Sequence, residues 1–201
     1  MSPYVVGPTR EIARAAVRES LSQAAFELVR ARGFQNVTLD DMAAAAGVSR
    51  STLLRYFGTK EDVLLSAFDA HVARFADALR ARPDDEDDWS ALHAVMGQVI
   101  AYYLDNPRGA LRMTKLIVDT PELAGRQLEK MHGWRPALTR ALADRRNITG
   151  PLPVALAVRA AAALSCLTVA VERWSASDGT EDLADLLRQG FEALGPATRG
   201  A

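Results

Sequence analysis

Side chains that bind anions and base edges are concentrated between residues 37 and 61, VTLDDMAAAAGVSRSTLLRYFGTKE. Hydroxyl, guanidinium and phenol groups follow one another there between two glycines, Gly47 and Gly58. Such groups donate hydrogen bonds to phosphate oxygens and to the edges of bases in a DNA groove. This stretch therefore indicates a binding site rather than a catalytic site, provided that the side chains share one face.

Two short helices joined by a glycine turn would place these side chains on one face. Thr38 is a suitable N-cap residue, and Asp41, three residues later, completes a capping box. Gly47 supplies the positive φ that a tight turn requires, and Ser49 begins the next helix. The pattern is that of a helix-turn-helix, although Ala-Gly-Val-Ser also occurs at ordinary corners between helices.

The second of these short helices has an inner and an outer side. Leu53 and Phe57 face the preceding helices and are expected in the core. The outer side either contacts phosphates and base edges or is an ordinary solvated face. Its side chains are Arg50, Ser51, Thr52, Leu54, Arg55 and Tyr56.

Charge is distributed unevenly along the chain, although the net charge is only −1. Up to Lys60 there are eight basic and five acidic residues, whereas the remainder has 16 basic and 20 acidic residues. A positively charged N-terminal part followed by an acidic remainder indicates that only the N-terminal part contacts a polyanion. Arg10 and Arg14 lie ahead of the motif, either as an arm that touches DNA or as an exposed helix extension, and the extension is favoured.

The fold class predicted for these 201 residues is all-α, with about nine helices. Nearly every periodic stretch has helical spacing, and no alternating apolar run leads into a hairpin turn. A helix-turn-helix domain is expected over residues 9–60 and a larger helical domain over residues 61–195. From their start and stop signals, helices are expected near residues 9–33, 38–47, 49–57, 59–82, 84–106, 108–118, 122–145, 154–174 and 181–194.

Cysteine content and apolar segments bear on where the protein works. The single Cys166 excludes an intramolecular disulfide and a multi-cysteine metal site, and it favours a reducing compartment. The N-terminus has no uninterrupted apolar run of the kind that marks a secretory signal, so a cytoplasmic protein is expected. Residues 152–171 are long enough to cross a membrane, but the central Arg159 favours a buried helix, and no membrane partner is expected.

Residues that could catalyse a reaction or bind a metal are scattered. His71, His93 and His132 have no His or Cys at metal-ligand spacing, and the chain has no phosphate-binding glycine loop or nucleophile elbow. The acidic run at 84–88 is either a metal site or the charged start of a helix, and the helix start is favoured because adjacent carboxylates on a helix diverge. We expect neither an enzyme nor a bound metal or cofactor.

The run from residue 20 to residue 68 closely resembles the N-terminal domain of the TetR family of transcription regulators. Its marks are Gly-Phe after the first helix, Thr at the start of the second, Ala-Gly-Val-Ser at the turn, Tyr-Phe closing the third and Lys-Glu opening the fourth. The resemblance implies that Thr38 and Lys60 meet phosphates at helix starts, where free N–H groups also attract anions. It also implies that Arg50 and Tyr56 reach a base or the backbone.

Other positions of the third helix follow from the same resemblance. Ser51, Thr52 and Arg55 would lie in the major groove, and Arg55 is either a bidentate reader of guanine or a phosphate contact. Leu54 departs from the family, in which a tyrosine is most common at this position. Apolar contact with a thymine methyl would replace the phenolic phosphate contact, so operators of relatives are unsafe guides for this chain.

The family resemblance also implies a homodimer, which doubles the base pairs read by one recognition helix. The last two predicted helices carry apolar stripes that either form a four-helix dimer interface, as in TetR relatives, or belong to the core of one chain. The residues of these stripes are Leu156, Ala160, Leu164, Leu167, Val171, Leu183, Leu187 and Phe191.

A small-molecule effector is the remaining partner that the resemblance implies. The middle helices carry Met and aromatic residues that either line its cavity or belong to the core. These residues are Met96, Tyr103, Met113, Leu116, Trp134 and Cys166. The C-terminal residues 171–194 weakly resemble a TetR subgroup whose members are thought to sense acyl thioesters or related metabolites.

The function predicted from the sequence is that of a ligand-responsive transcriptional regulator, most often a repressor in this family. A homodimer would bind a palindromic operator in double-stranded DNA and leave it when the effector binds. The alternative is an all-helical interaction or metabolite-binding module without specific DNA binding.

Overall fold

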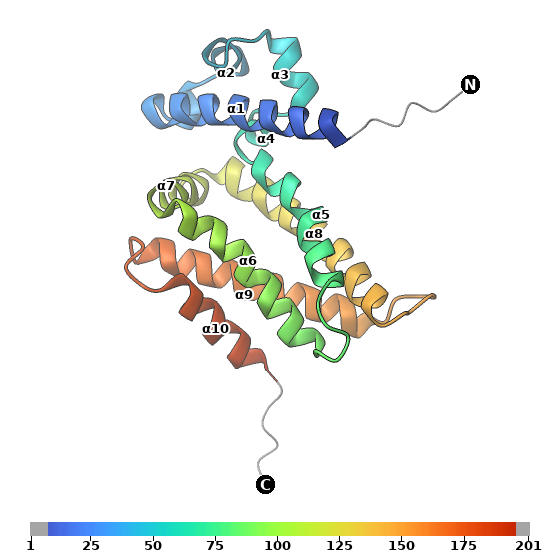
Figure 1. Ribbon diagram of the computed structural model, residues 1–201. Helices are drawn as coiled ribbons and strands as arrows, with labels where there is room; N and C mark the ends of the chain where they lie inside the picture. The colour runs from blue at the N-terminus through green and yellow to red at the C-terminus, as the bar shows by residue number, and fades with distance from the viewer. Residues whose placement is uncertain (1–7, 196–201) are drawn as a thin grey trace, which may run out of the picture. The chain divides into compact units, whose positions relative to one another are not determined.

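The computed structural model describes residues 8–195, with side chains described for residues 13–66 and 72–195. Every element within the described residues is a helix, which confirms the all-α class (Figure 1). The elements in chain order are α1 (Pro8–Arg32), η1 (Phe34–Asn36), α2 (Leu39–Ala45), α3 (Arg50–Tyr56), α4 (Lys60–Leu64), α5 (Ser66–Arg80), α6 (Asp88–Asp105), α7 (Pro107–Val118), α8 (Pro121–Arg145), α9 (Val154–Ala176) and α10 (Leu183–Leu194).

The chain divides into two compact units, one that ends at Ala70 and one that begins at His71. The first unit contains α1 to α4 and the start of α5, and the second contains the rest of α5 and α6 to α10. This division falls after α4, later along the chain than the boundary expected from the sequence between residues 60 and 61.

The first unit is built on α1, which packs against η1, α2 and α4, while α2 packs against α3. Ala25, Met42 and Leu53 contribute fully buried side chains to this core. The glycine positions predicted from the sequence mark the ends of elements here. Gly33 has a φ of 80° directly after α1, and Gly47 has a φ of 69° in the turn between α2 and α3.

Side-chain caps fix where the short helices begin. The Thr38 hydroxyl accepts a hydrogen bond from the Asp41 N–H at 3.1 Å, and the Asp41 carboxylate accepts one from the Thr38 N–H at 2.8 Å, which is the predicted capping box. Ser49 caps α3 by accepting from the Thr52 N–H at 3.1 Å. The acidic run also starts a helix, because the Asp87 carboxylate caps α6.

One predicted helix is wrong, because residues 59–82 form two helices rather than one. Thr59 caps α4, but Leu65 leaves helical geometry with a φ of −93° and a ψ of 13°, and α5 begins at Ser66. Five consecutive residues, 62–66, are buried here. A straight helix that lies on a surface buries only one stripe of its circumference. The interruption at Leu65 lets the chain bury all five.

The second unit is arranged around α9, which packs against α6, α7, α8 and α10 (Figure 1). Ala160 and Ala163 are fully buried and allow neighbouring helices to approach α9 closely. By length and composition α9 is the one helix among the described residues that could cross a membrane. Its place at the centre of a helical unit instead matches the buried helix predicted from Arg159.

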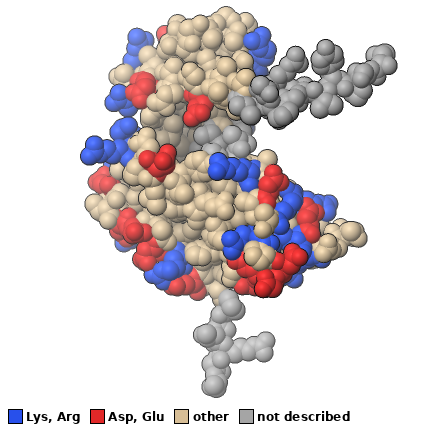
Figure 2. Space-filling view, in the orientation of Figure 1, with Lys and Arg blue, Asp and Glu red and all other residues tan. Residues whose placement is uncertain are grey.

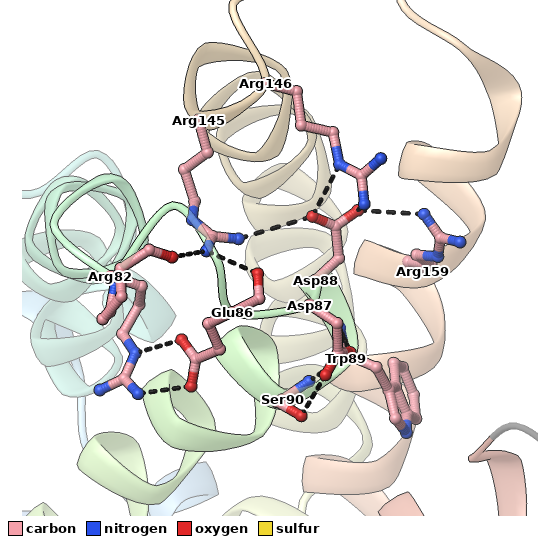
Figure 3. A network of polar contacts seen from close by, with 10 residues as sticks. Arg82, Glu86, Asp87, Asp88, Trp89, Ser90, Arg145, Arg146 and Arg159 are labelled. Carbon is pink, nitrogen blue, oxygen red and sulfur yellow. Dashed lines mark hydrogen bonds and ion pairs between the residues drawn. The ribbon is translucent and has the colours of Figure 1, made fainter.

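A buried carboxylate joins three parts of the second unit (Figure 3). Asp88, at the start of α6, is 3% exposed and accepts hydrogen bonds at 3.0 Å from Arg146, at the end of α8, and from Arg159 of α9. Arg145, also 3% exposed, lies 3.5 Å from the same carboxylate and donates to the carbonyls of Pro83 and Glu86. Arg159, which disfavours a membrane span, therefore has a structural partner in the core.

Candidate DNA-binding surface and effector region

The outward side of α3 is created by burial of its inward side. Leu53 is fully buried and Phe57 is 2% exposed, as the sequence predicted. With these two side chains fixed in the core, the remaining positions of α3 point away from it. Ser51, Leu54 and Arg55 are exposed, whereas Thr52 and Tyr56 are half-buried.

Hydroxyl groups at the start of α3 are already linked to one another. The Ser49 hydroxyl lies 3.0 Å from the Ser51 hydroxyl and donates to the Thr52 hydroxyl at 3.0 Å. Exposed Arg50 lies 3.4 Å from the carboxylate of Asp40 on α2. An exposed ion pair of this kind contributes little to stability, so Arg50 can exchange Asp40 for a phosphate at little cost.

Both residues expected to meet phosphates at helix starts have partners within the chain. The Thr38 hydroxyl takes part in the capping box and also donates to the Asp41 carboxylate at 2.6 Å. That side-chain bond first, and the bond from the Thr38 N–H second, hold the pKa of Asp41 below its ordinary value of 3.8. The Lys60 ammonium donates to the carbonyl of Phe34 and lies 3.9 Å from the centroid of the Phe34 ring. A phosphate contact by Lys60 would therefore share or replace a bond that now holds η1.

Sequence reasoning missed one residue that positions the recognition helix. Arg18 of α1 donates to the carbonyl of Tyr56 at 2.7 Å, and its guanidinium lies 4.9 Å from the centroid of the Phe57 ring. A cation suits the last carbonyls of a helix, where the helix dipole is negative. Arg18 thus ties the end of α3 to α1, and no local spacing could have indicated a contact across 38 residues.

Arg14 lies on α1, because the helix already begins at Pro8. This is the helix extension that the sequence favoured over a separate arm. The side chain of Arg10 lies outside the described residues. The Arg14 guanidinium carbon is 5.9 Å from the centroid of the Tyr56 ring, and that of Arg55 is 5.8 Å from the same centroid. A hollow of about 310 Å³ is lined by Arg14, Arg55 and Tyr56.

The residues predicted for the effector site lie in different parts of the second unit. Tyr103 packs edge-on against Trp174 at 6.0 Å, whereas Trp134 packs against Phe75 at 5.6 Å. Cys166 faces Gly190 of α10, where an added Cβ would lie 3.3 Å from the Cys166 Cβ. Of the three remaining residues predicted for this site, Met96 is buried, and Met113 and Leu116 are half-buried.

Burial also sets the protonation of two of these predicted residues. It raises the pKa of Tyr103 to about 12, and it raises the pKa of the Cys166 thiol. Both groups are largely neutral at physiological pH at their ordinary pKa values of 10.0 and 9.0, and burial keeps them so. Neutral side chains suit an apolar surrounding and do not supply a nucleophile.

A groove that the sequence did not indicate runs between α6 and α10 and encloses about 520 Å³. Small residues of α6, Ala94, Gly97 and Ala101, line it together with Leu187 and Arg188 of α10. The small residues at helical spacing are the signal in the sequence that could have indicated this groove.

On the visible face of the second unit, basic and acidic side chains intermingle, so this unit shows no surface of a single charge sign there (Figure 2).

The stripes predicted for a dimer interface are buried within the single chain. Each of the eight residues is at most 7% exposed: Leu156, Ala160, Leu164, Leu167, Val171, Leu183, Leu187 and Phe191. The alternative that the sequence left open, a core within one chain, accounts for them. The outward side of α9 presents other apolar residues, Val154, Val158 and Val169, which are 78%, 59% and 62% exposed.

Fold and surface together define a class of protein. The first unit presents a short, basic, hydroxyl-bearing helix, α3, on a helix-turn-helix scaffold, and a larger helical unit follows it in the chain. This is the organisation of proteins in which a DNA-binding domain is joined to a regulatory domain.

The family follows from sequence comparison. Residues 21–67 match the family described as bacterial regulatory proteins, tetR family, and residues 86–199 match the MftR C-terminal domain. The chain belongs to the TetR family of transcriptional regulators. It is a ligand-responsive DNA-binding regulator rather than an enzyme, as the sequence predicted, and TetR-family regulators act as dimers.

Individual relatives cover most of the chain. MftR of Mycobacterium tuberculosis, named as a transcriptional regulator of mycofactocin biosynthesis, is 30% identical over 189 residues, which span 90% of this chain and 91% of that protein. The regulator TcmR of Streptomyces glaucescens is 32% identical over 137 residues, 65% of this chain and 61% of its own length. The crystal structure of Thermus thermophilus FadR in complex with lauroyl-CoA has the same fold, with a TM-score of 0.58, 24% identity and coverage of 92% and 97%.

Proposed function

We propose that this cytoplasmic regulator binds a palindromic operator as a homodimer, with α3 of each copy in the major groove, and that an effector bound to residues 71–195 releases it. The observation that supports this most is the orientation of α3. Buried Leu53 and Phe57 turn Ser51, Leu54 and Arg55 outward together, within the stretch up to Lys60 that carries eight basic and five acidic residues. Phosphate contacts would fix the register of the helix, and outward side chains would read bases.

A genomic selection tests operator binding. Purified protein is mixed with sheared DNA from the source genome, and fragments retained at moderate salt are sequenced. We expect enrichment of a short inverted repeat whose half-sites lie about one helical turn, ~34 Å, or a multiple of it apart. Confirmed dimers that enrich no sequence over several salt concentrations would favour the alternative, a helical interaction or metabolite-binding module.

The selected operator then serves as a probe for the effector. Lauroyl-CoA is a reasonable first ligand, because a protein of the same fold is known in complex with it. We expect an effector to weaken operator binding and to raise the unfolding temperature, since a ligand shifts an equilibrium only by its differential affinity for two states. A ligand that stabilises the protein without changing operator affinity is bound but does not regulate.

A further inference from the structure

The inference concerns the end of the recognition helix, where two arginines from different helices lie near one aromatic ring. Arg14 comes from α1 and Arg55 from the last turn of α3, and their guanidinium carbons lie 5.9 and 5.8 Å from the centroid of the Tyr56 ring. Both arginines are exposed, and the three side chains line a common hollow. Residues 41 positions apart in the chain thus share one surface.

A third arginine holds this arrangement in place. Half-buried Arg18, one helical turn after Arg14, donates to the carbonyl of Tyr56 at 2.7 Å and stacks on Phe57. Because Phe57 is in the core, these contacts fix the backbone that carries Arg55 and Tyr56 relative to α1. The spacing between Arg14 and Arg55 is therefore set by the scaffold rather than by the two side chains alone.

Charge sets Arg14 and Arg55 apart from other arginines of the first unit. Arg30 pairs with Glu27 at 2.7 Å, and Arg50 lies 3.4 Å from Asp40. Among the side chains that the structure describes, Arg14 and Arg55 make no ion pair, and both guanidinium groups lie near the Tyr56 ring. Two guanidinium groups that have no acidic partner among the described side chains, and that lie beside one hollow, favour an anion with oxygens on more than one side.

We propose that Arg14 and Arg55, which line one hollow with Tyr56, together bind one phosphate of the DNA backbone. The inference rests on the proposed function, and it assigns Arg55 to the backbone rather than to guanine. Guanidinium groups present several N–H donors in a fixed fork that matches phosphate oxygens, and the Tyr56 hydroxyl is a further donor. The residues of α3 that line the hollow are its last two, Arg55 and Tyr56, so base reading is left to the earlier part of α3.

The test measures DNA affinity over a range of salt concentrations for Arg14→Gln, Arg55→Gln and the double variant. Each phosphate neutralised in duplex DNA contributes about 0.9 to the slope of log K against log salt. Loss of one phosphate therefore weakens binding about fivefold at ~0.15 M salt and about fifteenfold at ~0.05 M salt. We expect this loss in the double variant, equally for operator and for random duplex, because a phosphate carries no sequence information.

The double variant decides whether the two arginines share a phosphate. If they share it, the double loss is smaller than the product of the two single losses, and the slope falls by about 0.9 in total. Independent losses with a total change of about 1.8 would place them on two phosphates and overturn the proposal. It is equally overturned if Arg14→Gln binds like wild type, or if Arg55→Gln loses affinity at one base step of the operator only.

Arg30→Gln is the matched control, since Arg30 is an exposed arginine of α1 that is paired with Glu27. We expect it to bind both DNA probes like wild type, and thermal unfolding should be the same for all variants because the altered side chains are exposed. Failure of the proposed function looks different. In that case wild-type protein itself would show no preferred sequence and no salt dependence.

Discussion

Leu54 is the outward residue of α3 that carries no hydrogen-bonding group. It is 39% exposed and lies next to Arg55, on the side of the helix that faces away from the core. An apolar side chain at a DNA interface gains by covering an apolar group, and the thymine methyl is the apolar group that the major groove displays. We therefore expect that Leu54 contacts a thymine in each half-site of the operator.

Replacing that thymine by deoxyuridine should weaken operator binding by wild-type protein. Deoxyuridine lacks the methyl group, and one buried carbon is worth about 0.8 kcal/mol, or about a fourfold loss for each half-site. In Leu54→Ala the same replacement should have no effect, because the partner of the methyl is gone. A scan of deoxyuridine through every thymine of the operator, read by anisotropy, tests this. Equal responses of both proteins at all positions would show that Leu54 touches no methyl.

For a single residue, whether its contacts can be predicted from the sequence depends on how far away its partners lie along the chain. Leu53 and Phe57 were identified as core from helical spacing alone, because the period of a short helix fixes which side is buried. Arg18 was not, since its contacts with Tyr56 and Phe57 join α1 to α3. Only the packing of two helices decides which of several arginines on α1 reaches the end of α3.

At the scale of the element, the start of α2 should weaken in acid. The Thr38 hydroxyl and Thr38 N–H hold the pKa of Asp41 below 3.8, so ionised Asp41 stabilises the folded form. This contribution is complete above pH 3.8 and is lost as the pH falls through the lower pKa of the folded state. The free energy of unfolding of wild type should therefore exceed that of Asp41→Asn near neutral pH, and the gap should close in acid. Urea titrations of both proteins over pH measure it, and a gap that stays constant into acid would contradict the role of the capping box.

The Asp88 cluster should be the main polar determinant of how α6, α8 and α9 are joined. Asp88→Asn removes a buried carboxylate and leaves the 3%-exposed Arg145 without its anion. Breaking a buried pair costs about 3–5 kcal/mol, and the half-exposed Arg146 and Arg159 place the expected loss near the lower value, about 3 kcal/mol. Chemical denaturation of the full chain measures it.

The matched control for this prediction is Asp85→Asn, which removes an exposed carboxylate from the same acidic run. It should change the free energy of unfolding by less than about 0.5 kcal/mol, as surface substitutions usually do. Equal effects of the two substitutions would mean that the arginines around Asp88 are satisfied without it.

Helix starts and ends were largely predictable, and the exception shows why. Gly33, Gly47 and the caps at Thr38 and Ser49 are local signals, and the structure uses all of them. The break at Leu65 has no glycine, proline or cap to announce it. It follows from burial of five consecutive residues, which is a property of the core around α4 rather than of the local sequence.

At the scale of the whole molecule, the sequence pointed to the last two helices for dimer formation but selected their inward residues. In α9 apolar residues occur on nearly every side, so composition does not distinguish a core stripe from an outward one. The structure makes the distinction, because Leu164 and Leu167 are buried whereas Val158 and Val169 are exposed. The exposed apolar residues that these two helices leave for a second copy are therefore the outward valines of α9 and Leu194 of α10.

Val169→Glu should convert the dimer to monomers. Val169 is 62% exposed in the single chain, so a carboxylate there is tolerated by the monomer but would be buried without a partner between two copies. A monomer presents one recognition helix, and operator affinity should fall by at least about a thousandfold, towards that for random DNA. Sedimentation equilibrium gives the mass, and circular dichroism shows that the helices persist. Leu128→Glu, at an equally exposed position on α8, is the control and should remain dimeric. If Val169→Glu stays dimeric and binds the operator like wild type, the second copy packs on another face, and the exposed valines of α9 serve a different purpose.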